Sequence, residues 1–491
     1  MKMLIGGAKV DSSSKKTIDV INPANGKLVD TVPAATKEDI DKAVALSKIG
    51  QKEWAAKPMT ERCAIMDKFL DLFEEHRIEV LALLVRESGK NPGQGIFEYN
   101  FVRNAVPAYF ETAKRTCGEI LPAGADAGSE TDLMLVTHEP LGTVAAVVPF
   151  NASVMLMMWK VAPALAAGNA VIVKPATDNP LACIRVCELM LEAGVPGNAL
   201  QVVTGRGSEV GNWLVENPGI DGVTMTGSTE VGLGIAATMA KRLAPCALEL
   251  GGNDAFIVLE DANLDQAAAE AAFTRTDNCG QVCCAPKRFL VHNSVKDAFV
   301  EKLVGILKSL PQGYDDNVEE ALQRLFDGDT SYVNMIPCLI SEKAAIEVER
   351  QINLTVSQGA KIALGGKRDG AFVNPTVLVD VKKDMDVAQS MEIFGPVFSI
   401  IGVDSEEEAI EIANNTSYGL SGCVYTADWK RGMKIARSVK TGQMIINGPG
   451  IIRYLMQPFG GYKMSGVGRE DVWTLEEMMQ TKHINMKGFI D

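Results

Sequence analysis

The chain has 491 residues, which is too long for one hydrophobic core and predicts two or three globular domains. Its 48 basic and 62 acidic residues give a net charge of −14, which argues against nucleic acid as the main partner, because phosphate binding needs clustered Lys and Arg. The ten cysteines form no pair of CxxC modules and the four histidines no HExxH motif, so we expect no metal site. This cysteine usage, and a start at residues 1–7 without signal-peptide or leader features, predict a reducing, cytoplasmic location.

The first half of the chain begins with helices and continues as alternating strands and helices. Residues 38–89 carry apolar side chains at three- and four-residue steps, and Gly89 ends the run. From residue 143, short apolar runs alternate with helical segments: strands at 143–149, 170–175, 200–205 and 222–227, and helices near 153–168, 180–194, 208–217 and 229–241. Repeated βαβ units predict a parallel sheet with helices on both faces.

The most apolar stretch is residues 141–173, whose only charge is Lys160. Proline, asparagine and glycine interrupt it, so it predicts a strand, a helix and a second strand, with no membrane association.

A second series of elements follows residue 249. Strands near 255–259, 288–292 and 397–402 alternate with helices near 264–276, 294–309 and 406–415, which predicts a second α/β domain. Residues 118–136, with one proline and several glycines, predict a protruding hairpin, and the last twenty residues a terminal strand. We interpret residues 315–329 as a surface helix.

Two short motifs carry the candidate chemistry. Leu248-Glu249-Leu250-Gly251-Gly252 comes before Gly280-Gln281-Val282-Cys283, with 34 positions from Glu249 to Cys283. Ionised cysteine is a nucleophile, and a glutamate in an apolar setting can be held with a raised pKa for proton transfer. On spacing alone, Cys279, Cys283 and Cys284 are equal candidates for the nucleophile, and each could be only a buried apolar residue.

Both motifs resemble, in order and spacing, the active-site signatures of the aldehyde dehydrogenase superfamily. The resemblance implies that Cys283 is the nucleophile and that Glu249 activates the water that hydrolyses the thioester. It also implies that Asn151, in Pro149-Phe150-Asn151, supplies the side-chain half of an oxyanion hole. The glutamate argues against the coenzyme-A-acylating branch. Because attack requires thiolate, we expect the pKa of Cys283 to be lowered by local amide dipoles or by the positive nicotinamide ring.

The same resemblance predicts a dinucleotide site. The segment 226–232 ends a strand and opens a helix, which suits a pyrophosphate at the helix N-terminus. With the segments 173–175, 204–207 and 392–396 it is similar to the family's cofactor site, in which Lys174 and Glu392 would hold the two riboses and Phe394 would flank the nicotinamide. The predicted cofactor-binding residues are Phe150, Lys174, Thr177, Gly207, Gly227, Ser228, Val231, Leu250, Glu392 and Phe394.

The residue three positions after Lys174 bears on the choice between NAD and NADP. Many NAD-using members carry glutamate there, where it binds the adenosine ribose, whereas this chain has Thr177, which would not repel a 2′-phosphate. The segments 174–177 and 204–209 resemble those of the NADP-using, non-phosphorylating glyceraldehyde-3-phosphate dehydrogenases. Asp178 works against that reading, so we expect NADP and keep NAD as the alternative.

The substrate side has two candidate arginines. Arg453 and Arg115 resemble positions at which members acting on phosphorylated or carboxylated aldehydes hold the anionic tail, and a guanidinium grips two anion oxygens. This predicts a small anionic aldehyde such as succinate semialdehyde or glyceraldehyde 3-phosphate, with a surface or subunit-contact role as the alternative for each arginine. An apolar lining would instead suit lactaldehyde or an aliphatic aldehyde. The predicted substrate-binding residues are Arg115, Met155, Trp159, Arg453 and Phe459.

The resemblance covers essentially the whole chain, down to residues 458–466. It implies an α/β fold with a Rossmann-like cofactor domain (1–117 and 137–249) and a second α/β catalytic domain (250–464). A β-arm for oligomerisation (118–136 and 470–491) implies a homodimer or homotetramer. A rival from another class is a catalytically silent homologue that only binds a dinucleotide, because fold does not fix function. The intact set of Cys283, Glu249, Asn151 and Lys174 disfavours it.

Overall fold

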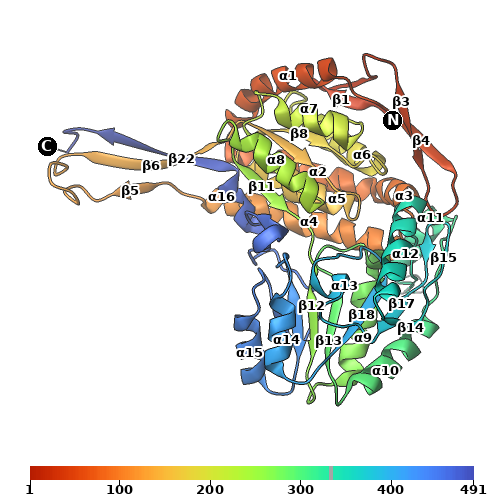
Figure 1. Ribbon diagram of the computed structural model, residues 1–491. Helices are drawn as coiled ribbons and strands as arrows, with labels where there is room; N and C mark the ends of the chain where they lie inside the picture. The colour runs from red at the N-terminus through yellow and green to blue at the C-terminus, as the bar shows by residue number, and fades with distance from the viewer. Residues whose placement is uncertain (331–334, 491) are drawn as a thin grey trace.

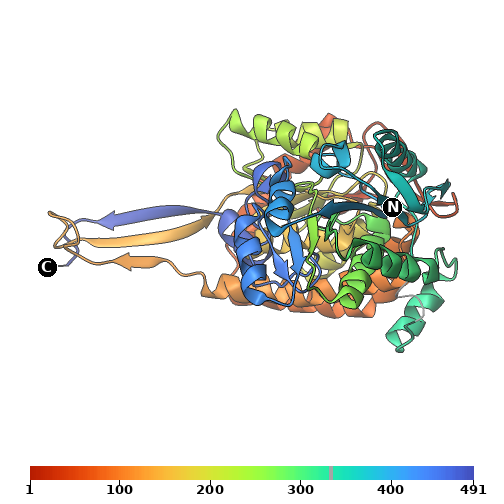
Figure 2. The same ribbon diagram turned by 60° about the horizontal axis from the view of Figure 1, so that its bottom comes forward.

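The computed structural model describes residues 1–330 and 335–490. An eight-stranded sheet and a seven-stranded sheet each carry helices, and a three-stranded ribbon projects from the first unit (Figure 1). After a turn of the molecule the ribbon still stands away from the body (Figure 2). The predicted α/β class is confirmed.

The first sheet positions most of the candidate site. Its central strands are parallel, in the order β9 (Leu200–Val202), β8 (Ala170–Lys174), β7 (Thr143–Val147), β10 (Gly222–Thr226) and β11 (Cys246–Glu249). The strands β1 (Met3–Ile5), β2 (Ala8–Val10) and β21 (Gly466–Val467) complete its edges. Because parallel strands end at one edge of a sheet, Lys174, Thr226 and Glu249 all lie at that edge, with Thr226 and Glu249 on neighbouring strands and β7 between β8 and β10.

Helices cover both faces of this sheet. They are α5 (Ser153–Ala166), α6 (Leu181–Ala193), α7 (Asn212–Glu216) and α8 (Thr229–Ala240), preceded by α1 (Lys37–Ala55), α2 (Met59–Glu75), α3 (Arg77–Ser88) and α4 (Pro92–Arg115). The predicted helical run ends at Gly89, whose φ of 69° suits a left-handed helix cap. A hairpin of β3 (Thr17–Ile21) and β4 (Leu28–Pro33) lies beside the N-terminus. The apolar stretch 141–173 forms β7, α5 and β8 as predicted, and no helix among the described residues is long and apolar enough to cross a membrane.

The second sheet runs in the order β14 (Lys361–Leu364), β17 (Thr376–Val379), β18 (Val397–Val403), β13 (Arg288–His292), β12 (Ala255–Val258), β19 (Gly422–Tyr425) and β20 (Ile445–Ile446). All its pairs are parallel except β14 with β17. Its helices are α9 (Leu264–Thr276), α10 (Lys296–Ser309), α12 (Glu342–Ser357), α13 (Asp386–Gln389), α14 (Glu406–Asn414) and α15 (Trp429–Ser438), and β15 (Arg368–Asp369) pairs with β16 (Phe372–Val373).

The segment 315–329 contains a helix, α11 (Val318–Phe326), as predicted. Its inner face is buried, and the Phe326 ring meets the Tyr99 ring edge-on at 5.5 Å. The segment therefore packs against α3 and α4, which belong to the part of the molecule built around the first sheet.

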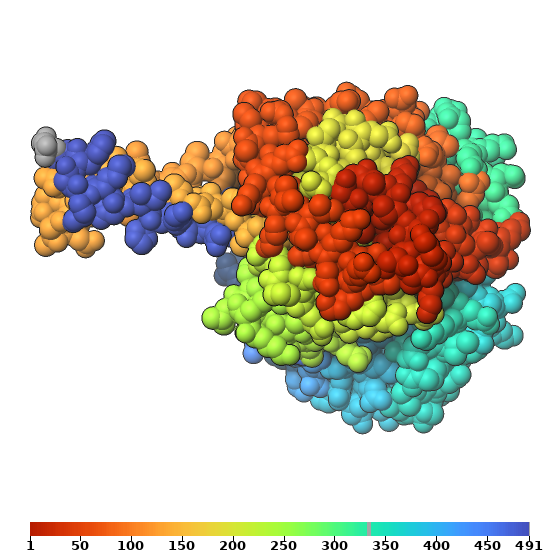
Figure 3. Space-filling view, turned by 90° about the horizontal axis from the view of Figure 1, so that it is seen from above, coloured from red at the N-terminus to blue at the C-terminus, as the bar shows by residue number. Residues whose placement is uncertain are grey.

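The arm consists of β5 (Glu119–Leu121), β6 (Leu133–Pro140) and β22 (Met479–Met486). The last strand pairs antiparallel with the whole of β6, beyond the short helix α16 (Thr474–Glu477). Figure 3 shows the segment around β5 and β6 (orange) and the C-terminal strand (blue) lying together and clear of the body. The predicted hairpin and terminal strand are confirmed as local structure. The domain boundaries stay a prediction. The strand β6 continues to Pro140, beyond the predicted end of the arm segment at 136, and β21, from late in the chain, pairs with β11 of the first sheet.

Candidate active site

The nucleophile loop, which we define as residues 277–287, joins α9 to β13. Asn278, Cys279 and Gly280 have successive φ values of 47°, 54° and 75°, a left-handed path that non-glycine residues adopt only when their surroundings enforce it. A Cβ on Gly280 would meet the carbonyl oxygen of Gly395 at 2.3 Å, so only glycine fits there. The Asn278 side chain donates to the carbonyl oxygen of Asn151 at 2.8 Å, which ties the loop to the predicted oxyanion-hole residue.

Buried cations hold this loop, and our sequence analysis missed them. Arg275 is fully buried and donates to the carbonyl oxygens of Gly280 (3.1 Å), Val397 (2.9 Å) and Ile393. It therefore fixes the start of the Cys283 loop against the segment that carries Glu392 and Phe394. The signal in the sequence was an arginine on the apolar face of a predicted helix, which is rarely buried without a purpose.

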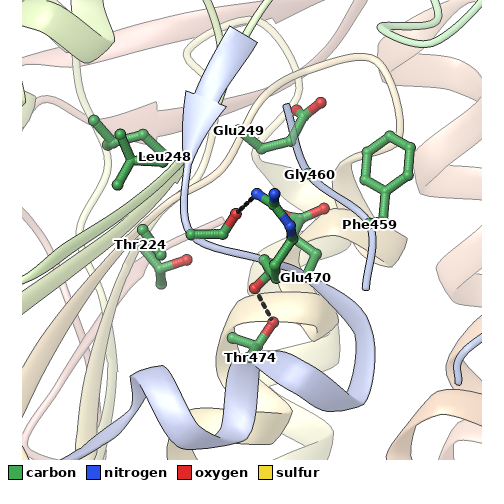
Figure 4. A pocket seen from close by; sticks show the side chains of 11 residues that line it. Thr224, Leu248, Glu249, Phe459, Gly460, Glu470 and Thr474 are labelled. Carbon is green, nitrogen blue, oxygen red and sulfur yellow. Dashed lines mark hydrogen bonds between the residues drawn. The ribbon is translucent and has the colours of Figure 1, made fainter. Parts of the chain in front are cut away.

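Glu249 ends β11 and is buried. Neither carboxylate oxygen accepts a hydrogen bond from any residue that the structure describes. Burial raises the pKa of Glu249 well above its ordinary value, and the nearby Cys283 and Glu470 raise it further, against Arg453 and Lys160. A small pocket beside Glu249 is lined by Thr224, Phe459 and Glu470 among others (Figure 4). The arrangement leaves both oxygens free for a water or a substrate.

Cys283 is only partly buried, and its thiol lies beside that of the buried Cys284. The hydrogen bond with Cys284 and then burial raise the pKa of Cys283 well above its ordinary value, against the positive charges of Arg453 and Lys287. Our expectation that local amide dipoles lower this pKa is wrong, because the second thiol and burial outweigh the two cations. The effect expected from the nicotinamide ring stays a prediction.

Arg453 lies between two aromatic rings close to the nucleophile. Its guanidinium carbon is 3.5 Å from the centre of the Trp159 ring and 3.7 Å from that of Phe459. Its Nε and Nη2 donate to Glu470 and Asp471 at 3.0–3.2 Å, and Nη1 donates to no acceptor in the described part of the chain. Three of the five predicted substrate residues therefore meet here.

The other two predicted substrate residues differ in their placement. Met155 lies in the first turn of α5, the helix that also carries Trp159. Arg115 ends α4 at the base of the arm, with a side chain 77% exposed and an ion pair of 3.4 Å to Glu111. The structure gives Arg115 no contact with the substrate cluster among the described residues, so we withdraw its proposed role.

Two acids and a lysine that the sequence analysis did not single out complete the cluster. Lys160 is buried and forms an ion pair of 3.1 Å with Glu470, which also binds Arg453. Burial raises the pKa of Asp471 to about 6, although Arg453 opposes this. The charge of Arg453 is thus partly balanced before any ligand binds.

Most of the predicted cofactor residues follow the carboxyl ends of strands in the first sheet, whereas Glu392 and Phe394 lie in the segment before β18 of the second sheet. Lys174 is buried, its ammonium has no acceptor among the residues described, and burial lowers its pKa to about 8 against the opposing charge of Asp178. Thr177 Oγ1 donates to the carbonyl of Gly205 at 3.1 Å. A Cβ on Gly205 would meet Val210 Cγ2 at 2.4 Å, while one on Gly207 would meet nothing within 4 Å.

The turn before α8 has the form expected of a pyrophosphate site. Ser228 caps the helix and accepts a hydrogen bond from the Val231 N–H at 3.4 Å, and the Val231 side chain is 50% exposed. A Cβ on Gly227 would meet Met225 Cε at 2.5 Å, and a Cβ on Gly232 would meet Leu250 Cδ2 at the same distance. Compact glycines at a helix N-terminus let a phosphate approach the backbone N–H groups.

Phe150, Phe394 and Glu392 are the residues predicted to lie at the nicotinamide end. The two rings meet edge-on with centroids 6.0 Å apart. Glu392 Oε1 accepts the Gly252 N–H at 3.3 Å and forms an ion pair with Lys287 at 3.3 Å. The unpartnered Lys174, the helix terminus and this acid together fit a dinucleotide. Within residues 1–330 and 335–490, no group of three or more His, Cys, Asp or Glu side chains is arranged to hold a metal.

Comparisons with known proteins agree with this geometry. The family model described as the aldehyde dehydrogenase family matches residues 9–484. A 3-sulfolactaldehyde dehydrogenase of Priestia aryabhattai is 37% identical over 96% of this chain and 95% of its own. The NADP-dependent succinate-semialdehyde dehydrogenase of Escherichia coli is 34% identical over 98% of this chain and 96% of its own.

Solved structures give the same result for the fold. A crystal structure of an NADP-dependent enzyme of Escherichia coli superposes with a TM-score of 0.92 at 33% identity, covering 99% of this chain and 98% of the other. A betaine aldehyde dehydrogenase of Staphylococcus aureus, solved with NAD⁺, also has a TM-score of 0.92, at 32% identity over 99% and 97% of the two chains.

The chain belongs to the aldehyde dehydrogenase family. It is an NAD(P)-dependent oxidoreductase that converts an aldehyde to the carboxylic acid.

Proposed function

We propose that the enzyme oxidises a small anionic aldehyde through a covalent Cys283 intermediate and prefers NADP. The observation that carries the catalytic part is Glu249, a buried acid beside Cys283 whose two oxygens accept no hydrogen bond from the described residues. A buried carboxyl without partners is unfavourable for stability, so its retention beside a nucleophile points to proton transfer.

The chain's own residues account for the steps. The Cys283 thiolate forms a bond to the aldehyde carbon, and the new alkoxide is held by the Asn151 amide and the Cys283 backbone N–H. A dinucleotide bound at the Lys174 edge supplies the hydride acceptor. Loss of hydride leaves a thioester on Cys283. Glu249 then takes a proton from water, which adds to the thioester and releases the acid and the thiol.

The anionic substrate class rests on Arg453. Glu470 and Asp471 occupy two nitrogens of its guanidinium, Nη1 remains without an acceptor in the described structure, and the Arg453 charge acts on the Cys283 thiol. The names of two relatives, 3-sulfolactaldehyde and succinate-semialdehyde dehydrogenase, point to aldehydes with an acidic group at the far end. Trp159 and Phe459, which stack on Arg453, would pack against the carbon chain between aldehyde and anion.

The NADP preference rests on Thr177, the neutral residue three positions after the buried Lys174. The E. coli relative at 34% identity is named as NADP-dependent, which supports the same choice.

Assembly and location are further proposals. The arm exposes Ile120, Ile484 and Phe489, and a second copy that covers these side chains would give a homodimer or homotetramer. All ten cysteines are free thiols in the described residues, which supports a reducing compartment such as the cytoplasm. Sedimentation of the purified enzyme and cell fractionation test the two proposals.

The catalytic proposal is tested by exchanging each of the neighbouring thiols. Cys283→Ala should abolish dehydrogenase activity while dinucleotide binding, measured by fluorescence titration, survives. Cys284→Ala is the matched control and should retain most activity. The reverse pattern would assign the nucleophile to Cys284, and a Cys283→Ala enzyme that is still active would refute covalent catalysis.

A further inference from the structure

Lys287 lies at the end of the nucleophile loop and has only 1% of its surface exposed. Its ammonium donates to the carbonyl oxygens of Cys283 at 2.5 Å and Ala285 at 3.1 Å. The same nitrogen forms an ion pair with Glu392 Oε1 at 3.3 Å. One atom thus bridges the nucleophile's own backbone and the acid that we place at the nicotinamide ribose.

Lysine suits this position because an ammonium has three N–H donors and no acceptor. The carbonyl oxygens of Cys283 and Ala285 and the Glu392 carboxylate are its nearest acceptors, and the carbonyl oxygen of Val282 lies at 3.5 Å. A buried cation costs several kcal/mol unless it is paired and hydrogen-bonded, so the full set of partners is what makes this burial tolerable. A neutral side chain of the same length would leave the carboxylate of Glu392 without its counter-charge.

The charge of Lys287 also reaches the thiol. The groups that face Cys283 are Cys284, Glu249, Arg453 and Lys287, from the nucleophile loop, the end of β11 and the loop after β20. Cys284 raises the pKa of Cys283, while Arg453 and Lys287 lower it. Arg453 is already paired with two carboxylates, whereas Lys287 has Glu392 as its one ion-pair partner among the described residues.

We propose that Lys287 is a positioning residue that ties the backbone of Cys283 to the carboxylate of Glu392 and places a positive charge beside the nucleophile. This inference rests on the proposed roles of Cys283 and Glu392. Binding of a ribose to Glu392 would then be felt at the nucleophile through a single side chain. The arrangement links cofactor binding to the reactivity of the Cys283 thiol.

The test measures alkylation of Cys283 by iodoacetamide in the cofactor-free enzyme, followed on the Cys283 peptide by mass spectrometry across pH 6–10. Lys287→Met should slow alkylation at pH 7 roughly tenfold, because loss of one nearby positive charge raises a pKa by about one unit and the thiolate is the reacting form. Lys287→Arg, which keeps the charge, should recover most of the rate. Parent-like alkylation of Lys287→Met would overturn the proposal.

The matched control is Arg288→Met. Arg288 is equally buried but donates to the carbonyl oxygens of Asn253, Ala388, Ile412 and Ala413, away from the nucleophile. In Arg288→Met, Cys283 should be alkylated at the parent rate. Equal slowing of Cys283 alkylation in Lys287→Met and Arg288→Met would mean that Lys287 has only a structural role.

A second variant keeps the proposal testable if Lys287→Met does not fold. Glu392→Gln removes the counter-charge from Lys287, so alkylation of Cys283 should become a few-fold faster, whereas an unchanged or slower rate would contradict the proposal. Alkylation needs neither cofactor nor turnover. Parent-like alkylation in the Lys287 and Glu392 variants would therefore refute only the role of Lys287. The proposed function would instead be refuted by dehydrogenase activity in Cys283→Ala.

Discussion

Glu249→Gln separates the two chemical halves of the reaction. The change keeps the shape of the side chain and removes its ability to accept a proton. Because neither oxygen has a partner in the described structure, no internal hydrogen bond is broken, and the stability should change by about 1 kcal/mol or less. Any large loss of activity in Glu249→Gln would then come from the missing base and not from a loss of stability.

The expected loss is on the order of 100-fold or more in steady-state turnover, which is the usual effect of removing a positioned base. A 100-fold loss is about 2.7 kcal/mol of transition-state stabilisation. Loss of hydride precedes attack by water, so the variant should still release about one reduced cofactor per active site in a stopped-flow burst and then stall. The exposed Glu476→Gln on α16 is the matched control and should behave as the parent.

The pH dependence provides a further check. Burial raises the pKa of Glu249, and the base must be ionised to act, so turnover of the parent should still rise with pH above the range in which an ordinary glutamate is already fully ionised. The variant should lose this rise. Absence of a burst would mean that Glu249 acts before hydride loss, and parent-like turnover would refute its role as the base.

Three further predictions concern the ligands. Arg453→Met should raise KM for succinate semialdehyde by roughly 10- to 150-fold and leave a neutral aldehyde of equal length almost unchanged, as a charge-assisted bond contributes about 1.5–3 kcal/mol; equal loss on both would make Arg453 purely structural. Thr177→Glu should shift the ratio of kcat/KM values toward NAD, because the new carboxylate repels a 2′-phosphate, and a parent enzyme that already favours NAD would contradict the premise. Burial lowers the pKa of Lys174 to about 8, so KM for NADP should rise as the pH passes 8 and the ammonium loses its proton; a KM that stays constant from pH 7 to 9 would exclude a charged Lys174 as a ligand of the cofactor.

Much of the local structure could be predicted from the sequence. The strand β8 and the helix α5 appear within a few residues of their predicted ranges, because an apolar run ended by proline, glycine or asparagine is a local signal. The order and spacing of the motifs around Glu249 and Cys283 were enough to indicate the family and the type of reaction. These features depend on residues that are close together in the sequence, so they can be predicted without knowing the tertiary structure.

The tertiary structure alone decided the electrostatics of the site. Lys160 and Glu470, which form an ion pair, are 310 residues apart, and no local pattern connects them. Arg115 and Arg453 were equivalent as sequence candidates, yet the end of α4 carries the first to the surface while the second is enclosed by aromatic rings and acids. Without a bound cofactor the pKa of Cys283 is raised, which the sequence could not indicate, because this pKa depends on burial and on groups brought close through space. Those distances exist only after both sheets and the loops between them have packed.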